Sequence, residues 1–91
     1  MNVRYEHRAE QDLRDVVAHM HALGHPDPEV FANLLRYRIA SIAMFPNSGH
    51  PVPETSVHEW PLQGSPYIVL YVPHATGIDI LRVLNSADEA R

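Results

Sequence analysis

The protein is a chain of 91 residues, of which 45% are hydrophobic and 20% are charged. This composition excludes a disordered chain, and the length predicts one domain over residues 1–91. No apolar run reaches the roughly 18 residues that cross a membrane, and the first residues lack a signal-peptide core, so we expect a cytoplasmic protein without a membrane partner. The absence of cysteine excludes disulfides and thiol chemistry.

The charge of the chain is acidic overall. Arginine supplies all seven fixed positive charges, and eleven acidic residues bring the net charge to −4. A basic surface is the usual electrostatic footprint of a protein that binds nucleic acid. Because this chain lacks such an excess, we do not expect it to bind nucleic acid directly.

The N-terminal part of the chain predicts a strand followed by an amphipathic helix. Residues 2–6 alternate between apolar and polar side chains, as in a short strand that needs a partner strand to be stable. Residues 8–23 predict a helix with one apolar face, and Gly24 is placed to end it. The residues of this face lie at i, i+3, i+4 and i+7, and they are Leu13, Val16, Val17 and Met20.

A second helix is predicted over residues 28–44. Asp27 can cap its first turn, and Pro28 occupies the first helical position, where proline is favoured. Its apolar stripe is broad enough to contact both the first helix and a sheet. The residues of the stripe are Phe31, Leu34, Leu35, Ile39, Ile42 and Phe45. The short turn between the two helices predicts an antiparallel helical hairpin.

The second half of the chain predicts strands. Residues 46–53 contain three prolines and a glycine, which excludes regular structure there, and residues 57–60 predict a short edge strand. Residues 67–72 and 78–84 carry the strongest β signal and are joined by a loop with proline and glycine, as in a β-hairpin. The polar tail, residues 86–91, is expected to fray.

The order of these elements predicts an α+β protein, βααβββ, with the helical hairpin packed on one face of an antiparallel sheet. The other face of the sheet would be uncovered, and we expect Tyr67, Tyr71 and Arg82 to form a binding surface on it. Ten apolar residues are expected to be mostly buried. They are Leu13, Val16, Val17, Met20, Phe31, Leu35, Ile39, Ile42, Val69 and Leu81.

The histidines of the first helix do not predict a metal site. His19 and His21 lie about 200° apart around a helix, and Gly24 ends the helix before His25 is reached. Without cysteine or a convergent carboxylate, the set lacks the ligands of a zinc site. We therefore expect neither a metal nor another cofactor.

Three other residues bear on the cleavage of RNA. Such a reaction without metal needs a base, an acid and a cation, and His58, Glu59 and Arg82 are the candidates for these roles. Adjacent residues of a strand point to opposite faces, so His58 and Glu59 are not expected to serve one site. The alternative is that both are solvated strand residues and that Arg82 pairs with an acid.

Three segments, taken in order, resemble the RelE/ParE family of bacterial toxins, and within it the ParE-like members. They are the N-terminal strand with the acidic helix AEQDLRDVVAHM, the segment IASIAMFPNSGHPVPE, and the hairpin segment YIVLYVPHATGIDILRVLNSADEA. The resemblance covers nearly the whole chain. It implies the βααβββ fold and a cytoplasmic toxin of a type II pair, which a cognate antitoxin holds inactive in a hetero-oligomer.

The resemblance also implies a target. Characterised ParE-like members inhibit DNA gyrase, whereas RelE-like members cleave mRNA on the ribosome. The implied function is therefore a ParE-like toxin that inhibits gyrase by binding and has no catalytic residue. Two alternatives stay open, a ribosome-dependent mRNA endonuclease and a non-toxic partner that still binds an antitoxin.

The chain departs from the family pattern at basic positions. Ile68 stands where the family commonly has arginine, and residues 85–88 read Asn-Ser-Ala-Asp where His-Gly-Ala-Arg is common. Arg82 is the one basic position that matches. Because the transition state of phosphoryl transfer needs nearby cations, and Asp88 would repel phosphate, these changes argue against RNA cleavage.

Two sets of residues are the candidates for binding. The residues expected to contact the target are His58, Trp60, Tyr67, Tyr71, Arg82 and Asn85. An equally good explanation of Trp60 is that its side chain packs over the hydrophobic core. An apolar groove of the helical hairpin is expected to accept an antitoxin helix, unless its side chains are consumed internally. The residues expected there are Leu13, Val17, Met20, Phe31 and Leu34.

Overall fold

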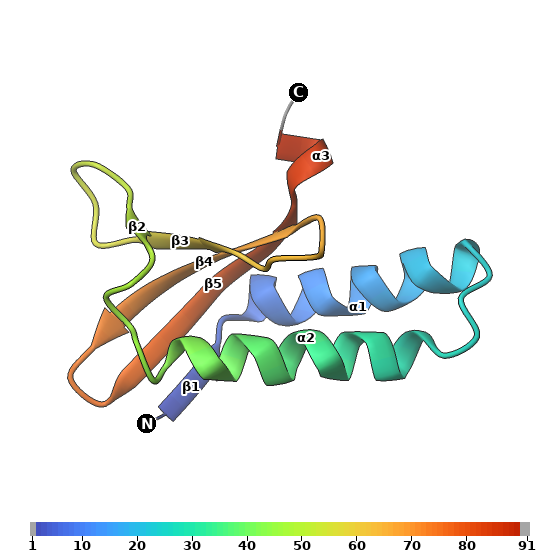
Figure 1. Ribbon diagram of the computed structural model, residues 1–91, viewed down its shortest axis with the longest axis horizontal. Coiled ribbons are helices and arrows are strands. Elements are labelled where there is room, and N and C mark those ends of the chain that lie inside the picture. Colours follow the sequence, from blue (N-terminus) through green and yellow to red (C-terminus); the bar gives the residue numbers. More distant parts are fainter. Residues whose placement is uncertain (1, 90–91) are drawn as a thin grey trace.

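The computed structural model describes residues 2–89, without the side chains of residues 88 and 89. The elements are β1 (Asn2–Tyr5), α1 (His7–Ala22), α2 (Pro28–Ile42), β2 (His50–Pro51), β3 (His58–Pro61), β4 (Tyr67–His74), β5 (Gly77–Asn85) and α3 (Ser86–Glu89). The two long helices run antiparallel beside a five-stranded sheet (Figure 1). The predicted α+β class and helical hairpin are confirmed.

The sheet has the strand order β1-β5-β4-β3-β2. Neighbouring strands from β2 to β5 pair antiparallel, whereas β1 runs parallel to β5 and pairs Asn2 with Gly77 and Tyr5 with Ile80. The predicted pairing of the N-terminal strand with the hairpin is therefore confirmed. Its parallel direction makes the sheet mostly, rather than wholly, antiparallel.

Two short elements occupy segments that were predicted to be irregular. The prediction for residues 46–53 is wrong at β2, which pairs with β3 as the last strand of the sheet. Proline is tolerated there because an edge strand has one side that needs no ladder hydrogen bond. The expectation of a frayed tail is wrong for Ser86–Glu89, which form α3. Residues 90 and 91 of that tail lie outside the described residues.

The ends of the helices follow the predicted local signals. Gly24 adopts a φ of 78°, the left-handed conformation that ends α1. The Asp27 side chain accepts a hydrogen bond from the backbone N–H of Val30 at 3.3 Å and so caps α2. The hairpin turn between these residues projects away from the sheet (Figure 1).

A bulge in β5 explains why its sequence does not alternate. Leu70 pairs with Arg82 but Tyr71 pairs with Ile80, so Leu81 is an extra residue in β5. An extra residue shifts the alternation by one position. Ile80 and Val83 can therefore both be buried, at 0% and 3% exposure, although they are three residues apart.

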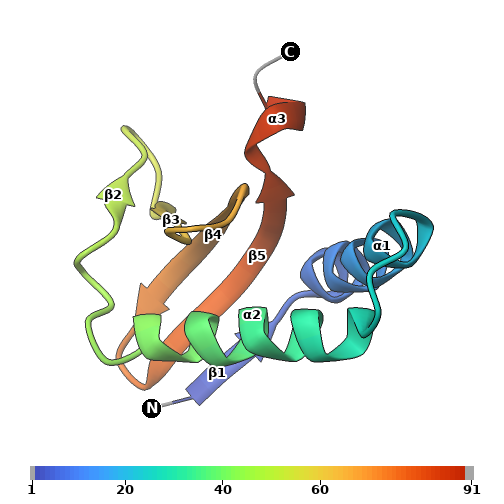
Figure 2. The same ribbon diagram turned by 45° about the vertical axis from the view of Figure 1, so that its right-hand side comes forward.

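The hydrophobic core lies between the helices and one face of the sheet. Figure 2 shows α2 crossing below the strands while α1 lies beside β5. Of the ten residues predicted to be buried, six are buried in the structure, namely Leu13, Val16, Leu35, Ile39, Ile42 and Val69. The other four, Val17, Met20, Phe31 and Leu81, are half-buried. Leu81 differs from the prediction because it is the extra residue of the bulge.

Replacement of Ile39 by alanine tests this core. Ile39 is fully buried, so Ile39→Ala should lower the free energy of unfolding by roughly 2–5 kcal/mol in a denaturant titration. Leu23→Ala is the control because Leu23 is 67% exposed, and its effect should stay within about 0.5 kcal/mol. Similar losses for the two variants would contradict this account of the core.

Candidate functional site

A carboxylate of α1 completes the edge of the sheet where β1 ends. β1 pairs only with residues 77–80 of β5, so the rest of β5 has no strand on that side in the described chain. Asp12, only 9% exposed, accepts a hydrogen bond from the backbone N–H of Val83 at 2.9 Å. It also accepts two hydrogen bonds from the guanidinium of Arg82, at 2.8 and 3.0 Å. Asp12 thus joins α1 to β5 through backbone and side chain.

The sequence contains a signal for Asp12, a charged residue on an otherwise apolar helix face. Asp12 stands three residues after Ala9 and four before Val16, so it lies on the apolar face of α1. A carboxylate in that position must find hydrogen-bond donors, because burying an unpaired charge is costly. The sequence could not identify Arg82 as the donor, since the pair is separated by 70 residues.

A groove of about 590 Å³ surrounds this ion pair. It lies between α1, the end of β5 and α3, and its lining includes Tyr67, Arg82 and Asn85, three of the six predicted target-binding residues. Asn85 accepts a hydrogen bond from the backbone N–H of Ala87 at 2.9 Å and so fixes the start of α3. The groove brings these three candidates together, but beside Asp12 and Asp15 rather than beside free cations.

The prediction that Tyr67 and Tyr71 lie on the uncovered face of the sheet is wrong. Their side chains share a face, as predicted, but it is the face covered by the helices, and their exposed fractions are 3% and 0%. The Tyr71 hydroxyl donates to the Pro46 carbonyl at 2.8 Å and accepts from the Gly49 N–H at 3.1 Å. Burial raises the pKa of Tyr71. Its role in the structure is to hold the loop after α2 against the sheet.

Gly49 is required by this contact. A side chain at position 49 would collide with the ring and the hydroxyl of Tyr71. The glycine of the loop therefore serves a close approach to the sheet.

The residues of β3 point to two different faces. The His58 ring lies 5.5 Å from the Tyr71 ring on the covered face, whereas Glu59 pairs with Leu70 and is exposed. Nδ1 of His58 is buried and has no hydrogen-bond partner in the described chain. His58 therefore points away from Glu59. Arg82 stands opposite Leu70 in the same row as Glu59, but its guanidinium is bonded to Asp12. The acid, the base and the cation of RNA cleavage thus do not share one face.

Trp60 combines the two roles considered for it. Its side chain is half-buried and packs against the core. It also lines a groove of about 490 Å³ together with Arg38 and His50.

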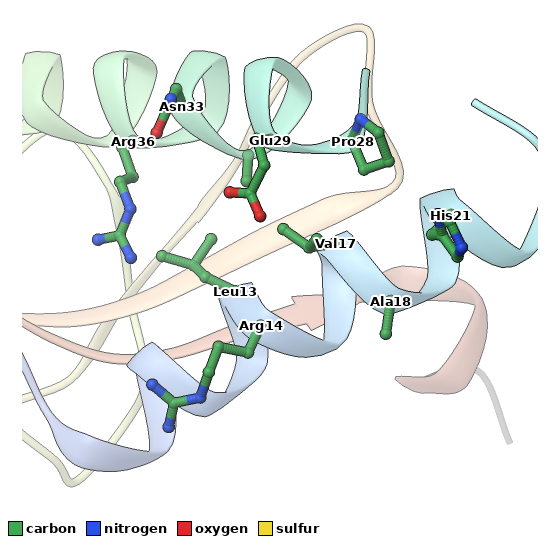
Figure 3. Close-up of a pocket in the computed structure, with 10 residues that line it drawn as sticks. Leu13, Arg14, Val17, Ala18, His21, Pro28, Glu29, Asn33 and Arg36 are labelled. Carbon is green, nitrogen blue, oxygen red and sulfur yellow. The ribbon is translucent and has the colours of Figure 1, made fainter. Parts of the chain in front are cut away.

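A third groove, of about 530 Å³, lies between α1 and α2. Figure 3 shows Leu13 and Val17 of α1 turned toward α2, with Glu29 and Arg36 of α2 turned toward α1. Only Leu13 and Val17 of the predicted antitoxin-binding residues line this groove.

The other three predicted antitoxin-binding residues lie elsewhere. Met20 and Phe31 are half-buried and pack against the core. Leu34 is 56% exposed and lies about 200° around α2 from Arg36, which is outside the groove.

The rim of this groove is a polar clamp between the two helices. The Arg36 guanidinium donates two hydrogen bonds to Glu10, at 3.2 and 2.8 Å, and lies 5.0 Å from the centre of the Tyr5 ring. This hydrogen bonding lowers the pKa of Glu10 and raises the pKa of Arg36. Burial raises the pKa of Tyr5. Arg14, on the same rim, bonds to the Gln11 amide oxygen at 3.0 Å and to no carboxylate of the described chain.

A further polar cluster stabilises the junction of β1 with the β4–β5 turn. Arg4 and His74 both bond to Asp79, with distances of 3.1 Å from the Arg4 Nη2 and from the His74 Nε2. Hydrogen bonding to Arg4, and secondarily to His74, lowers the pKa of Asp79. No group of three or more histidine, aspartate or glutamate side chains that could hold a metal ion occurs among the described side chains.

Comparison with known proteins identifies the family. Residues 3–90 match the family described as "ParE toxin of type II toxin-antitoxin system, parDE". The chain belongs to the ParE toxin family. The resemblance to ParE-like toxins in the sequence is therefore confirmed.

A solved structure shares the ParE fold of this chain. It is described as "Chromosomal ParDE TA system from P. aeruginosa", and the match has a TM-score of 0.80 and covers 93% of this chain and 95% of that chain. The sequence identity is 18%, so the likeness concerns the fold. No curated protein matches the sequence. Neither α1, α2 nor any other described helix has the length and apolar character to span a membrane.

Replacement of Asp12 by alanine tests the junction of α1 with β5. Asp12→Ala leaves the Val83 N–H and the Arg82 guanidinium without their acceptor, and should lower the free energy of unfolding by roughly 3 kcal/mol. Asp15→Ala, on the same helix, removes an exposed carboxylate that bonds to Gln11 alone among the described residues. It should change the free energy of unfolding by about 0.5 kcal/mol or less. Equal effects in urea titrations would contradict the role of Asp12.

The Glu10–Arg36 clamp predicts an acid-dependent loss of stability. A lowered pKa in the folded state stabilises the fold above the unfolded pKa of about 4.3, and this contribution is lost as pH falls through the folded pKa. Glu10→Gln should therefore remove part of the decrease in unfolding free energy between neutral pH and acid. Glu54→Gln, at an exposed position, should retain it. Identical pH profiles for the two variants would show that the clamp is not coupled to folding.

Proposed function

We propose that this ParE family member is the toxin of a type II pair, that it inhibits DNA gyrase by binding, and that a cognate antitoxin neutralises it in the cytoplasm. The observation that supports binding over catalysis is that His58 and Glu59 point to opposite faces of β3, while the Arg82 guanidinium is bonded to Asp12. Arg82, the one basic residue that matches the family pattern, is engaged by Asp12. A guanidinium that is already paired with a carboxylate stabilises the negative charge of a phosphoryl group less well.

The groove between α1 and α2 is the proposed antitoxin site. Leu13 and Val17 provide an apolar floor for one face of an amphipathic helix. Arg14 adds a positive charge at the rim that forms no salt bridge with a described carboxylate, although Glu10 and Glu29 lie nearby. The antitoxin segment should therefore be a helix with an acidic residue beside its apolar face.

The groove between α1, β5 and α3 is the proposed target surface. Three of the residues selected from the sequence, Tyr67, Arg82 and Asn85, line it. Asn85 is the one to test, because Tyr67 is nearly buried and Arg82 is part of the fold. The side chain of Asp88 lies outside the described residues.

Expression of the chain without an antitoxin tests the function. We expect growth arrest with gyrase-dependent DNA breaks and without new ends in ribosome-bound mRNA. Asn85→Ala should weaken both the arrest and the breaks, whereas Asn47→Ala, at an exposed position away from this groove, should not. New mRNA ends in phase with codons would overturn the proposal in favour of an endonuclease. Normal growth with neither signal would favour a non-toxic partner.

Neutralisation tests the antitoxin groove separately. Co-expression of the protein encoded by the adjacent reading frame should restore growth. Val17→Glu should prevent this rescue because it places a charge on the apolar floor of the groove. Leu23→Glu is the matched control, since Leu23 is 67% exposed and lies outside both this groove and the outer face of α2. Rescue of both variants would exclude this groove as the antitoxin site.

A further inference from the structure

Helix α2 has a second apolar face that is not part of the core. Val30, Leu34 and Tyr37 are 50%, 56% and 78% exposed. Together with the exposed Ser41 they form an outer stripe with spacings of four, three and four residues, which is the heptad spacing of a helix that pairs with another helix. Met44 and Phe45, just after α2, are also exposed, at 71% and 63%, and extend the stripe.

The outer stripe points away from the rest of the molecule. Leu35, Ile39 and Ile42 define the core side of α2. At about 100° per residue, Leu34 lies roughly 140° around the helix from Ile39, and Tyr37 lies roughly 160° from Leu35. No residue of the stripe lines the groove between α1 and α2. A helix can therefore lie along the stripe without touching the sheet or filling that groove.

We propose that the outer stripe pairs with the same stripe of a second copy of this chain, with the two α2 helices antiparallel. In this arrangement Leu34 of each copy packs against Tyr37 of the other, and Val30 packs against Ser41. These contacts follow from the heptad spacing. Leu34 and Ser41 occupy one apolar heptad position, and Val30 and Tyr37 occupy the other. In an antiparallel pair of helices, each of these positions faces the other position of the partner helix. The pattern is self-complementary, as a two-fold interface requires.

The charge of the stripe favours a second copy as the occupant. None of its four residues is charged, and Asn33 and Ala40, which flank it on one side, are neutral and exposed. On the other side, Arg38 has a partly exposed side chain. A chain with a net charge of −4 repels its copies, but contact through a neutral stripe adds no pair of buried like charges. The antitoxin groove, in contrast, is lined by charged residues, among them Arg14, Glu29 and Arg36.

The size of the stripe predicts a weak dimer. The segment from Val30 to Ser41 is about 18 Å long, so a contact of two such helices falls at the low end of protein interfaces. Tyrosine is one of the residue types enriched at the energetic centre of interfaces, and Tyr37 lies in the middle of the stripe. The dimer should therefore dissociate on dilution, and substitutions at Leu34 or Tyr37 should weaken it most.

Sedimentation of the purified chain over a range of concentrations tests the proposal, and it does not depend on toxin activity. The unmodified chain should pass from monomer to dimer as the concentration rises. Leu34→Glu should raise the dissociation constant at least roughly tenfold without unfolding the chain, since Leu34 is exposed. Leu23→Glu, at an exposed leucine outside the stripe, should leave it unchanged. A monomer at all concentrations, or a dimer insensitive to Leu34→Glu, would overturn the proposal.

Crosslinking tests the direction of the helices. The chain contains no cysteine, so each introduced thiol is unique. Under mild oxidation, a mixture of the Leu34→Cys and Tyr37→Cys variants should form more disulfide-linked dimer than either variant alone. Preferential linkage within Leu34→Cys alone would indicate parallel helices and contradict the arrangement. Loss of antitoxin binding in Leu34→Glu, without any dimer of the unmodified chain, would assign the stripe to the antitoxin instead.

Discussion

The hydrogen bonds of Asp12 to Val83 and Arg82 are the constraint on which the rest of the structure depends. β1 is too short to cover the whole of β5, and an uncovered strand edge is open to pairing with other chains. Asp12 satisfies one backbone donor of that edge and holds α1 beside it. The position of α1 then sets the position of α2, and with it the two grooves that border the helices.

The Asp12–Arg82 contact also changes the role to be expected for Arg82, the basic residue of β5. Arg82 can be expected from the sequence to face a target, but two of its five N–H donors are directed to a carboxylate of the fold. The Arg36–Glu10 pair acts similarly between the two helices. Three of the seven arginines, Arg4, Arg36 and Arg82, thus join elements of this ParE family member through carboxylates.

Local patterns in the sequence predicted the elements well because helices and turns depend on near neighbours. The Asp27–Pro28 start of α2, the Gly24 end of α1 and the apolar face around Leu13 are all local signals, and the structure confirms them. The functional surfaces were harder to predict because they depend on contacts between distant segments. Two residues of one strand, Tyr67 and Tyr71, share a face by alternation, but only the placement of the helices decides which face is buried. The bulge at Leu81 and the short strand β2 show the same limit, since both depend on the register between strands.

The parallel pairing of β1 with β5 has a consequence for synthesis of the protein. Arg4 bonds to Asp79, 75 residues further along the chain, and Asp12 bonds to Arg82 and Val83, which are also synthesised much later. A growing chain therefore cannot close its sheet until its last strand has left the ribosome, because contacts of such long separation form late. A prematurely terminated chain lacks the strand that joins β1 to the rest of the sheet, so incomplete copies of this ParE family member should not fold.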